Sequence, residues 1–273
     1  MTTINTNLSS LNAQRNLTKS GNDLSTSMQR LSSGLRVNSA KDDAAGMSIA
    51  TKMDSQIRGM SQASRNANDG ISLIQTADGA LSNIGDALQR IRELAVQGAN
   101  ATNGTDEWKN IDTEVQELTK EITRIATETK FNGNAVLAMG TAGASKDNQV
   151  GADSGQKITV KFGDSTAYGK PTVAAITDVA TAATALAQMD TALTALNTER
   201  SSLGTAQNRM GYAISNLATS IENQSAAKSR IMDTDYAAET SKLSRSQVLQ
   251  QAGTAMLAQA NSAPNSVMSL LRG

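Results

Sequence analysis

Apolar residues recur at spacings of three, four and seven along most of the chain, a pattern typical of helices that pack against other helices. Between residues 50 and 95 two such stripes run in parallel. One contains Met53, Ile57, Met60, Ala67, Ile71, Ile74, Leu81 and Leu88, and the other Leu73, Ala77, Ala80, Ile84, Ala87, Ile91 and Leu94. A helix with two apolar stripes must be covered on two sides, so this pattern predicts a helix within a bundle.

Two further helices are expected on the same grounds. The first helix should end near Gly98, before the polar run at 100–105, and the next carries Ile111, Val115, Leu118, Ile122 and Ile125. That helix should stop before Asn132-Gly133, a dipeptide typical of hairpin turns. A further helix is predicted from Ala182 to Ile221, where apolar residues again recur at spacings of three and four. A helix of roughly 40 residues is about 60 Å long, and such a length favours coiled-coil packing.

The two ends of the chain carry narrower stripes. In the C-terminal one Leu249, Met256, Ala263 and Leu270 recur every seven residues, and no residue from Ser246 to Leu271 is charged. Interspersed amides exclude a lipid-facing helix. Two interpretations stay open: burial among copies of the chain, where charge would be costly, or a frayed tail. Pro264 is expected to kink or end the helix near Ala263.

The segment 141–179 has a different composition, dominated by Gly, Ala, Ser, Thr and Asp. Its run KITVKFG at 157–163 predicts a strand, and a second strand is expected near Val173–Thr177. Because the segment lies outside both helical repeats, we expect a small insertion at the tip of a helical hairpin. Deletion of 143–177 is therefore expected to be tolerated.

These patterns together predict a mainly α fold. We expect a long antiparallel coiled-coil or helical-bundle hairpin that pairs the N- and C-terminal segments, with the small β-containing insertion at its tip.

Composition excludes most catalytic chemistry. The 273 residues include no cysteine and no histidine, which removes thiolate sites, the commonest general base and the commonest metal ligand. Only one tryptophan, three tyrosines and two phenylalanines are present, although aromatic residues dominate most pockets. We therefore expect no enzyme activity, no cofactor and no metal.

Charge and hydropathy limit the classes of partner that the chain can have. With 25 basic and 25 acidic residues the net charge is zero, so no nucleic-acid partner is expected. The chain contains no stretch of 18 or more apolar residues, so no membrane insertion is expected. Residues 1–16 do not follow the pattern of a secretory signal peptide. The compartment stays open at this point.

Two local features concern helix starts. Asp42 and Asp43 are adjacent, and we favour a helix cap over a cation site, because hard cations need several converging oxygens. Trp108, the single tryptophan, is expected to anchor the start of its helix by packing.

Five segments carry long motifs. They are RLSSGLRVNSAKDDAAGMSIA at 30–50, LQRIRELAVQGAN at 88–100, KFNGNAVLA at 130–138, SAAKSRIMDTDYAAE at 225–239 and VLQQAGTAMLAQAN at 248–261. In sequence and order they resemble bacterial flagellin. The resemblance implies an inner tube domain from 1–43 with 235–273 and a helical shell domain from 44–140 with 180–234. Residues 141–179 would be a short variable insertion.

The resemblance also implies the function. Such a chain is a structural subunit that assembles into the extracellular flagellar filament used for swimming, and the flagellar type III system exports it without a cleaved signal peptide. Implied partners are other copies of the chain, an export chaperone that binds the C-terminal region, hook-junction and cap proteins, and the flagellin-sensing Toll-like receptor of a host. Folding of the two ends should be coupled to polymerisation.

Two sets of residues carry these expectations. The resemblance implies a subunit-interface and receptor-recognition surface at Arg90, Leu94, Gln97 and Glu114, on what is otherwise an ordinary solvated helix flank with local ion pairs. Assembly of the inner tube is expected to involve Leu8, Leu11, Leu31, Leu249, Met256, Ala260, Val267 and Leu270.

Three other classes of protein are alternatives. A hook–filament junction protein shares the terminal helices, and a cytoplasmic coiled-coil scaffold shares the periodicity. An inserted zinc peptidase would need histidines, which the chain lacks. Hydroxyls of the insertion are weak candidates for O-glycosylation: Ser145, Ser154, Thr159, Ser165 and Thr166.

Overall fold

Long helices make up most of the molecule. The computed structural model describes residues 6–137, 145–162 and 166–272, of which 166 and 263–272 are described by their backbone alone. The helices are α1 (Leu8–Ser33), α2 (Ala44–Gly98), α3 (Thr105–Glu128), α4 (Thr166–Gly169), α5 (Val179–Met232) and α6 (Tyr236–Arg272). The mainly α fold expected from the periodicity is confirmed, and so is the end of α2 at Gly98.

The described chain divides into two compact units. The terminal unit comprises residues 1–55 and 223–273, and the central unit comprises residues 56–222. Both boundaries fall inside the long helices α2 and α5 rather than at the helix breaks near 43 and 234. The segment 141–179 belongs to the central unit.

The core of the central unit is built from α2, α3 and α5. Its largest fully buried aliphatic side chains include Ile74, Leu81, Ile84, Leu88 and Ile91 from α2, Ile122 from α3, and Met189, Leu203 and Met210 from α5. Members of both α2 stripes are buried there, which confirms that this helix is covered on two sides.

Short-range contacts define the ends of α3. The Trp108 Nε1 donates a hydrogen bond to the Gly98 carbonyl at 2.8 Å, so the indole ties the end of α2 to the start of α3. After α3, β1 (Lys130–Phe131) and β2 (Asn134–Ala135) form an antiparallel hairpin. Asn132 and Gly133 form its turn with φ of 49° and 78°, as the Asn-Gly dipeptide predicted.

The insertion contains a second antiparallel hairpin, formed by β3 (Ser145–Gln149) and β4 (Lys157–Lys161). The strand predicted from KITVKFG is confirmed as β4. The strand expected near Val173–Thr177 is wrong, because those residues are irregular and Ile176 instead packs into the core. The actual partner, SKDNQ, has no apolar alternation to reveal it; cross-strand pairing to β4 determines its structure.

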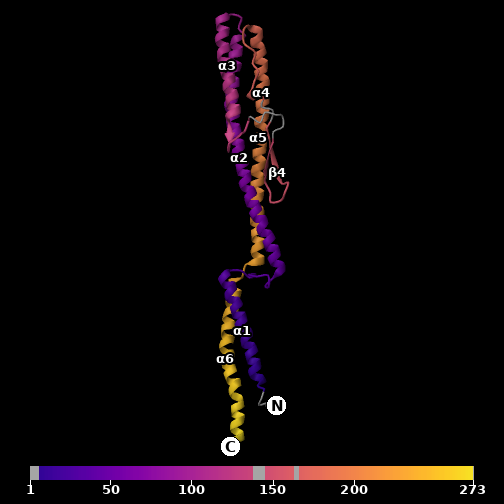
Figure 1. Ribbon diagram of the computed structural model, residues 1–273, viewed down its shortest axis with the longest axis vertical. Coiled ribbons are helices and arrows are strands. Elements are labelled where there is room, and N and C mark those ends of the chain that lie inside the picture. The colour runs from indigo at the N-terminus through magenta and orange to yellow at the C-terminus, as the bar shows by residue number, and fades with distance from the viewer. Residues whose placement is uncertain (1–5, 138–144, 163–165, 273) are drawn as a thin grey trace. The chain divides into compact units, whose positions relative to one another are not determined.

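The β3–β4 hairpin lies beside α2 and α5, away from the tip of the helical hairpin (Figure 1). Asn66 of α2 donates its Nδ2 to the Gln149 carbonyl at 3.2 Å, and a Cβ on Gly59 would stand 3.0 Å from the Cβ of Ala152. The end of α3, at Ile125 and Glu128, adjoins α2 near Thr76 and Ala80. The hairpin therefore covers the stretch of α2 that α3 is too short to reach.

Side chains of the insertion complete the central core. Among the described residues of the insertion, five buried side chains belong to this core: Ile158, Val160, Phe162, Tyr168 and Ile176. Deletion of 143–177 would uncover this core, so the structure argues against the tolerance expected from the sequence. Of the proposed glycosylation hydroxyls, Thr159 bonds to Asp147 at 2.7 Å, whereas Ser165 and the Thr166 side chain lie outside the described residues.

Shortening Val160 to alanine should lower the free energy of unfolding by about 2 kcal/mol, because the lost methyl groups leave a cavity in a packed site. Chemical denaturation monitored by far-UV dichroism measures this. The neighbouring exposed residue is the matched control, and Lys161→Ala should change stability by less than about 0.5 kcal/mol. Equal changes in the free energy of unfolding for the two substitutions would mean that the hairpin does not pack against the core.

Candidate assembly surfaces

Helices α1 and α6 form an antiparallel pair in the terminal unit (Figure 1). At one end Asn7 donates its Nδ2 to the Ala260 carbonyl at 2.7 Å, and at the other the Tyr236 hydroxyl donates to the Leu31 carbonyl at 3.0 Å. Between them Leu17 lies against Gly253, where an added Cβ would stand 3.2 Å from the leucine Cδ1. The pairing of the N- and C-terminal segments predicted from the sequence is therefore confirmed.

Helix α6 continues past Pro264 to Arg272, so of the two effects expected of this proline, a kink or a helix end near Ala263, the helix end is wrong. A proline removes one backbone donor and crowds the preceding turn, at a cost of about 3 kcal/mol. The remaining hydrogen bonds of a 37-residue helix continue on both sides of it.

The inner seam of this pair is narrow and partly polar. In the described parts of the two helices the buried side chains are Ser27, Glu239 and Ser246. Half-buried apolar side chains accompany them: Ala13, Leu17, Leu24, Leu31, Leu243, Leu257 and Ala260. No large apolar side chain of the described parts of α1 and α6 is fully buried, so the pair by itself has little hydrophobic core.

Larger apolar side chains of the pair remain exposed. Leu8 is 65% exposed and Met256 64%, and the other exposed members are Leu11, Met28, Val248 and Leu249. Of the residues expected to build the inner tube, Leu31 and Ala260 thus lie at the seam, while Leu8, Leu11, Leu249 and Met256 are exposed. Val267 and Leu270 fall in the part of α6 whose side chains lie outside the described set.

A buried carboxylate joins the two helices at Glu239. Its Oε1 accepts a hydrogen bond from the Ser27 hydroxyl at 2.7 Å, and its Oε2 accepts one from Lys242 at 3.1 Å, with Arg30 at 4.0 Å. Burial raises the pKa of this carboxyl, but the bonds from Ser27 and Lys242 outweigh it, so the pKa lies below its ordinary value.

The loops next to the pair are held by backbone contacts and an aspartate cap. Thr234 donates its N–H to the Gly34 carbonyl at 3.0 Å. Asp43 caps α2 by accepting the Gly46 N–H at 2.8 Å, which confirms the cap interpretation. Asp42 accepts from the Ser39 hydroxyl and N–H, which lowers the pKa of its carboxyl. Among the described residues no cluster of three acidic side chains could hold a metal ion.

The flank around Arg90 bridges two helices of the central unit. Arg90 donates from Nη2 to Glu114 of α3 at 2.8 Å and from Nη1 to Glu93 at 3.3 Å, so the structure brings Arg90 and Glu114 together. Gln97 is exposed on the same helix. Leu94 is only 3% exposed and belongs to the core, which excludes it from the exposed surface implied by the resemblance.

An adjacent ion pair was not foreseen. Arg92 donates its Nε to Asp190 of α5 at 2.7 Å, across 98 residues of sequence. Nothing in the local spacing could indicate this partner, because only the packing of α2 against α5 brings the two side chains together. Ion pairs therefore connect this part of α2 to both α3 and α5.

None of the helices, over the residues described, combines the length and apolar content needed to cross a membrane.

Glu239→Gln should loosen the α1–α6 pair in polymerised protein at neutral pH, where the buried charge is hydrogen-bonded. Amide exchange across α1 should become at least about tenfold faster, since hydrogen bonds to charged groups contribute about 1.5–3 kcal/mol. Because the folded pKa is lowered, this stabilisation is present above the unfolded pKa of about 4.3 and is lost as pH falls through the folded pKa. The difference from wild type should therefore vanish on acidification.

The control is Glu93→Gln, which removes an exposed carboxylate and should leave α1 exchange unchanged. A difference that persists at low pH would show that charge at Glu239 does not hold the pair.

Comparison with known proteins covers nearly the whole chain. Residues 4–142 match the family described as the bacterial flagellin N-terminal helical region, and residues 186–271 match its C-terminal helical region. The flagellin of Xenorhabdus nematophila is 46% identical over 98% of this chain and 99% of its own length. That of Halalkalibacterium halodurans is likewise 46% identical, with the same coverage.

Structural similarity agrees with these matches. The crystal structure of Bacillus cereus flagellin is 36% identical to the chain and superposes with a TM-score of 0.51. The superposition covers 56% of this chain and 88% of that one.

Proposed function

The chain belongs to the bacterial flagellin family, and we propose that α1 and α6 carry contacts through which its copies join in the flagellar filament. Membership makes the chain a structural subunit of that filament and not an enzyme. It assembles with copies of itself into a homopolymer, which is an extracellular structure.

One observation carries the proposal: the α1–α6 pair leaves several large apolar side chains exposed. Covering a leucine or methionine side chain contributes about 1.5–3 kcal/mol, and a homopolymer repeats each such contact in every copy. Leu8, Leu11, Leu249 and Met256 would supply these contacts, while Leu31 and Ala260 hold the pair together. From their sequence register, Val267 and Leu270 would extend the same surface.

The neutral run of α6 supports the same proposal. No residue from Ser246 to Leu271 is charged, although this stretch is exposed over most of its described length. Exposed helices ordinarily gain solubility from charge, whereas a charge that becomes covered must be desolvated. Absence of charge is thus expected where copies of α6 surround one another.

Met256→Glu should abolish polymerisation and leave the monomer unchanged. The carboxylate is hydrated in the monomer, where Met256 is exposed, and would be desolvated between copies, at a cost of several kcal/mol per subunit on a rough scale. Sedimentation of seeded subunits measures the critical concentration, and far-UV dichroism checks the monomer. Position 256 is a sharper test than Ala260, because a charge at Ala260 would also act on the seam.

Asn134→Asp serves as the control for this test, since it adds a carboxylate at an exposed position of β2 in the central unit and should polymerise normally. Normal assembly of Met256→Glu would refute burial of this face.

The exposed flank at Arg90, Gln97 and Glu114 is the second proposed contact. We infer that it packs on the next subunit and is the surface that the flagellin-sensing Toll-like receptor recognises in free monomers. The proposal is supported by the match of LQRIRELAVQGAN to the family, by the exposure of these side chains, and by the hydrogen-bonded Arg90–Glu114 pair that joins α2 to α3. Leu94 would support this surface from beneath, within the core.

Arg90→Ala should reduce receptor signalling by the monomer at least tenfold and impair swimming, since arginines are frequent interface hot spots. Its fold should survive, because exposed ion pairs contribute only about 0–1 kcal/mol. A receptor reporter assay and a melting curve measure the two effects. Arg124 is a matched control, as it also pairs with two carboxylates, Glu121 and Glu128, on an exposed helix face.

Arg124→Ala should signal like wild type. Full signalling by a folded Arg90→Ala variant would leave the Arg90 flank as an ordinary solvated surface.

Export is the remaining part of the proposal. We propose that the flagellar type III system secretes the chain and that an export chaperone covers α6 before assembly. The exposed Val248, Leu249 and Met256 offer the apolar face such a chaperone would need. Hook-junction and cap proteins would meet the same terminal helices at the two ends of the filament.

A further inference from the structure

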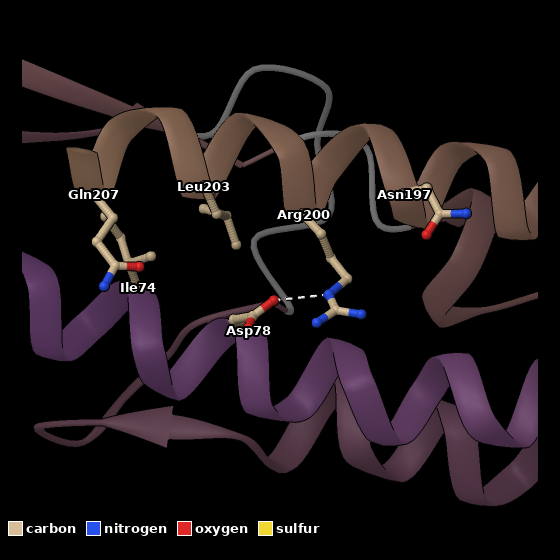
Figure 2. A pocket seen from close by; sticks show the side chains of 7 residues that line it. Ile74, Asp78, Asn197, Arg200, Leu203 and Gln207 are labelled. Atoms are coloured by element: carbon tan, nitrogen blue, oxygen red, sulfur yellow. Dashed lines mark hydrogen bonds and ion pairs between the residues drawn. The ribbon is translucent and has the colours of Figure 1, made fainter. Parts of the chain in front are cut away.

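An open cleft lies between α2 and α5 in the central unit (Figure 2). Its volume is about 290 Å³. The buried side chains of Ile74 and Leu203 line it, while Asp78, Asn197, Arg200 and Gln207 add polar groups. The lining is therefore mainly polar, and recognition there would depend on hydrogen bonds and charge more than on apolar contact.

Arg200 presents unused hydrogen-bond donors in this cleft. Its Nε donates to Asp78 Oδ1 at 2.8 Å, which orients the guanidinium (Figure 2). Its Nη1 and Nη2 have no hydrogen-bond partner in the part of the chain that the structure describes, and the side chain is 40% exposed. A guanidinium held on one edge leaves the other edge free for a planar acceptor such as a carboxylate.

The cleft is also lined by Gly204, a glycine in the interior of α5 that no contact within the subunit requires. A Cβ added to Gly204, which lines the cleft, would meet no described atom within 4 Å, and the same holds for Gly211 two turns further along that face. Glycine inside a helix costs about 1 kcal/mol relative to alanine. Packing within the subunit does not require these glycines, whereas close approach of another molecule to α5 would.

We propose that this cleft receives a second copy of the chain in the filament, which places an Asp or Glu carboxylate against Nη1 and Nη2 of Arg200. A copy is the expected occupant because every subunit of a homopolymer presents the same surface to its neighbours. The volume suits one or two side chains rather than a domain, and the free donors fix the charge of the group they accept. The inference rests on filament assembly but not on the α1–α6 contacts.

Cysteine protection tests the proposal directly, because the chain has no cysteine of its own. Gln207→Cys places a thiol at the cleft, and Ser202→Cys places one on the opposite face of α5, five residues before it. Each variant is copolymerised with an excess of wild-type subunits, so that the filament forms normally. Maleimide should label the Gln207→Cys variant at least about tenfold more slowly in filaments than in monomers. It should label the Ser202→Cys variant at nearly the same rate in both states.

Filling the cleft gives a second, independent readout. Gly204→Leu should raise the critical concentration about tenfold or more while the monomer melts no lower than wild type, since leucine favours helix over glycine. Ser202→Leu adds the same side chain two residues away and should assemble normally. Arg200→Gln should behave like Gly204→Leu in assembly, which separates the carboxylate contact from simple obstruction.

Equal labelling of position 207 in monomers and filaments, or equal effects of leucine at 202 and 204, would overturn the cleft contact. Wild-type filaments would still form in that case, so the proposal for α1 and α6 would stand and the two failures would be distinguishable.

Discussion

A helix with apolar residues on two faces needs partners on both, and this constraint shapes the central unit. Helix α5 covers one face of α2, and α3 covers part of the other. Because α3 ends beside Thr76 and Ala80, the β3–β4 hairpin covers the part of α2 that precedes Thr76. A segment with the composition of a loop, 141–179, thereby becomes part of the core.

The terminal unit meets the same constraint only in part. Its inner seam contains small side chains and one hydrogen-bonded carboxylate, Glu239, while larger apolar groups stay exposed. A pair with so little buried apolar surface gains little against the entropy of ordering its helices. Copies of the chain can supply the missing cover, and membership of a filament-forming family agrees with that requirement.

Polar contacts between helices complement this packing. The pairs Arg90–Glu114, Arg92–Asp190 and Arg200–Asp78 each join different helices of the central unit. Exposed pairs of this kind add little free energy but restrict how two helices can slide. They keep guanidinium groups in defined positions at the surface, which is the property that recognition by another molecule requires.

The sequence by itself determined the helices, the Asn132-Gly133 turn, the Asp43 cap and the family, because periodicity, turn chemistry and long motifs are local properties. Only the tertiary structure decided that Leu94 is buried beside exposed Arg90, and that Met256 is exposed while Ala260 lies at the seam. It also decided where the insertion packs and which carboxylate each arginine meets. Periodicity states which residues share a face of a helix, but which partner covers that face depends on contacts between segments far apart in the chain.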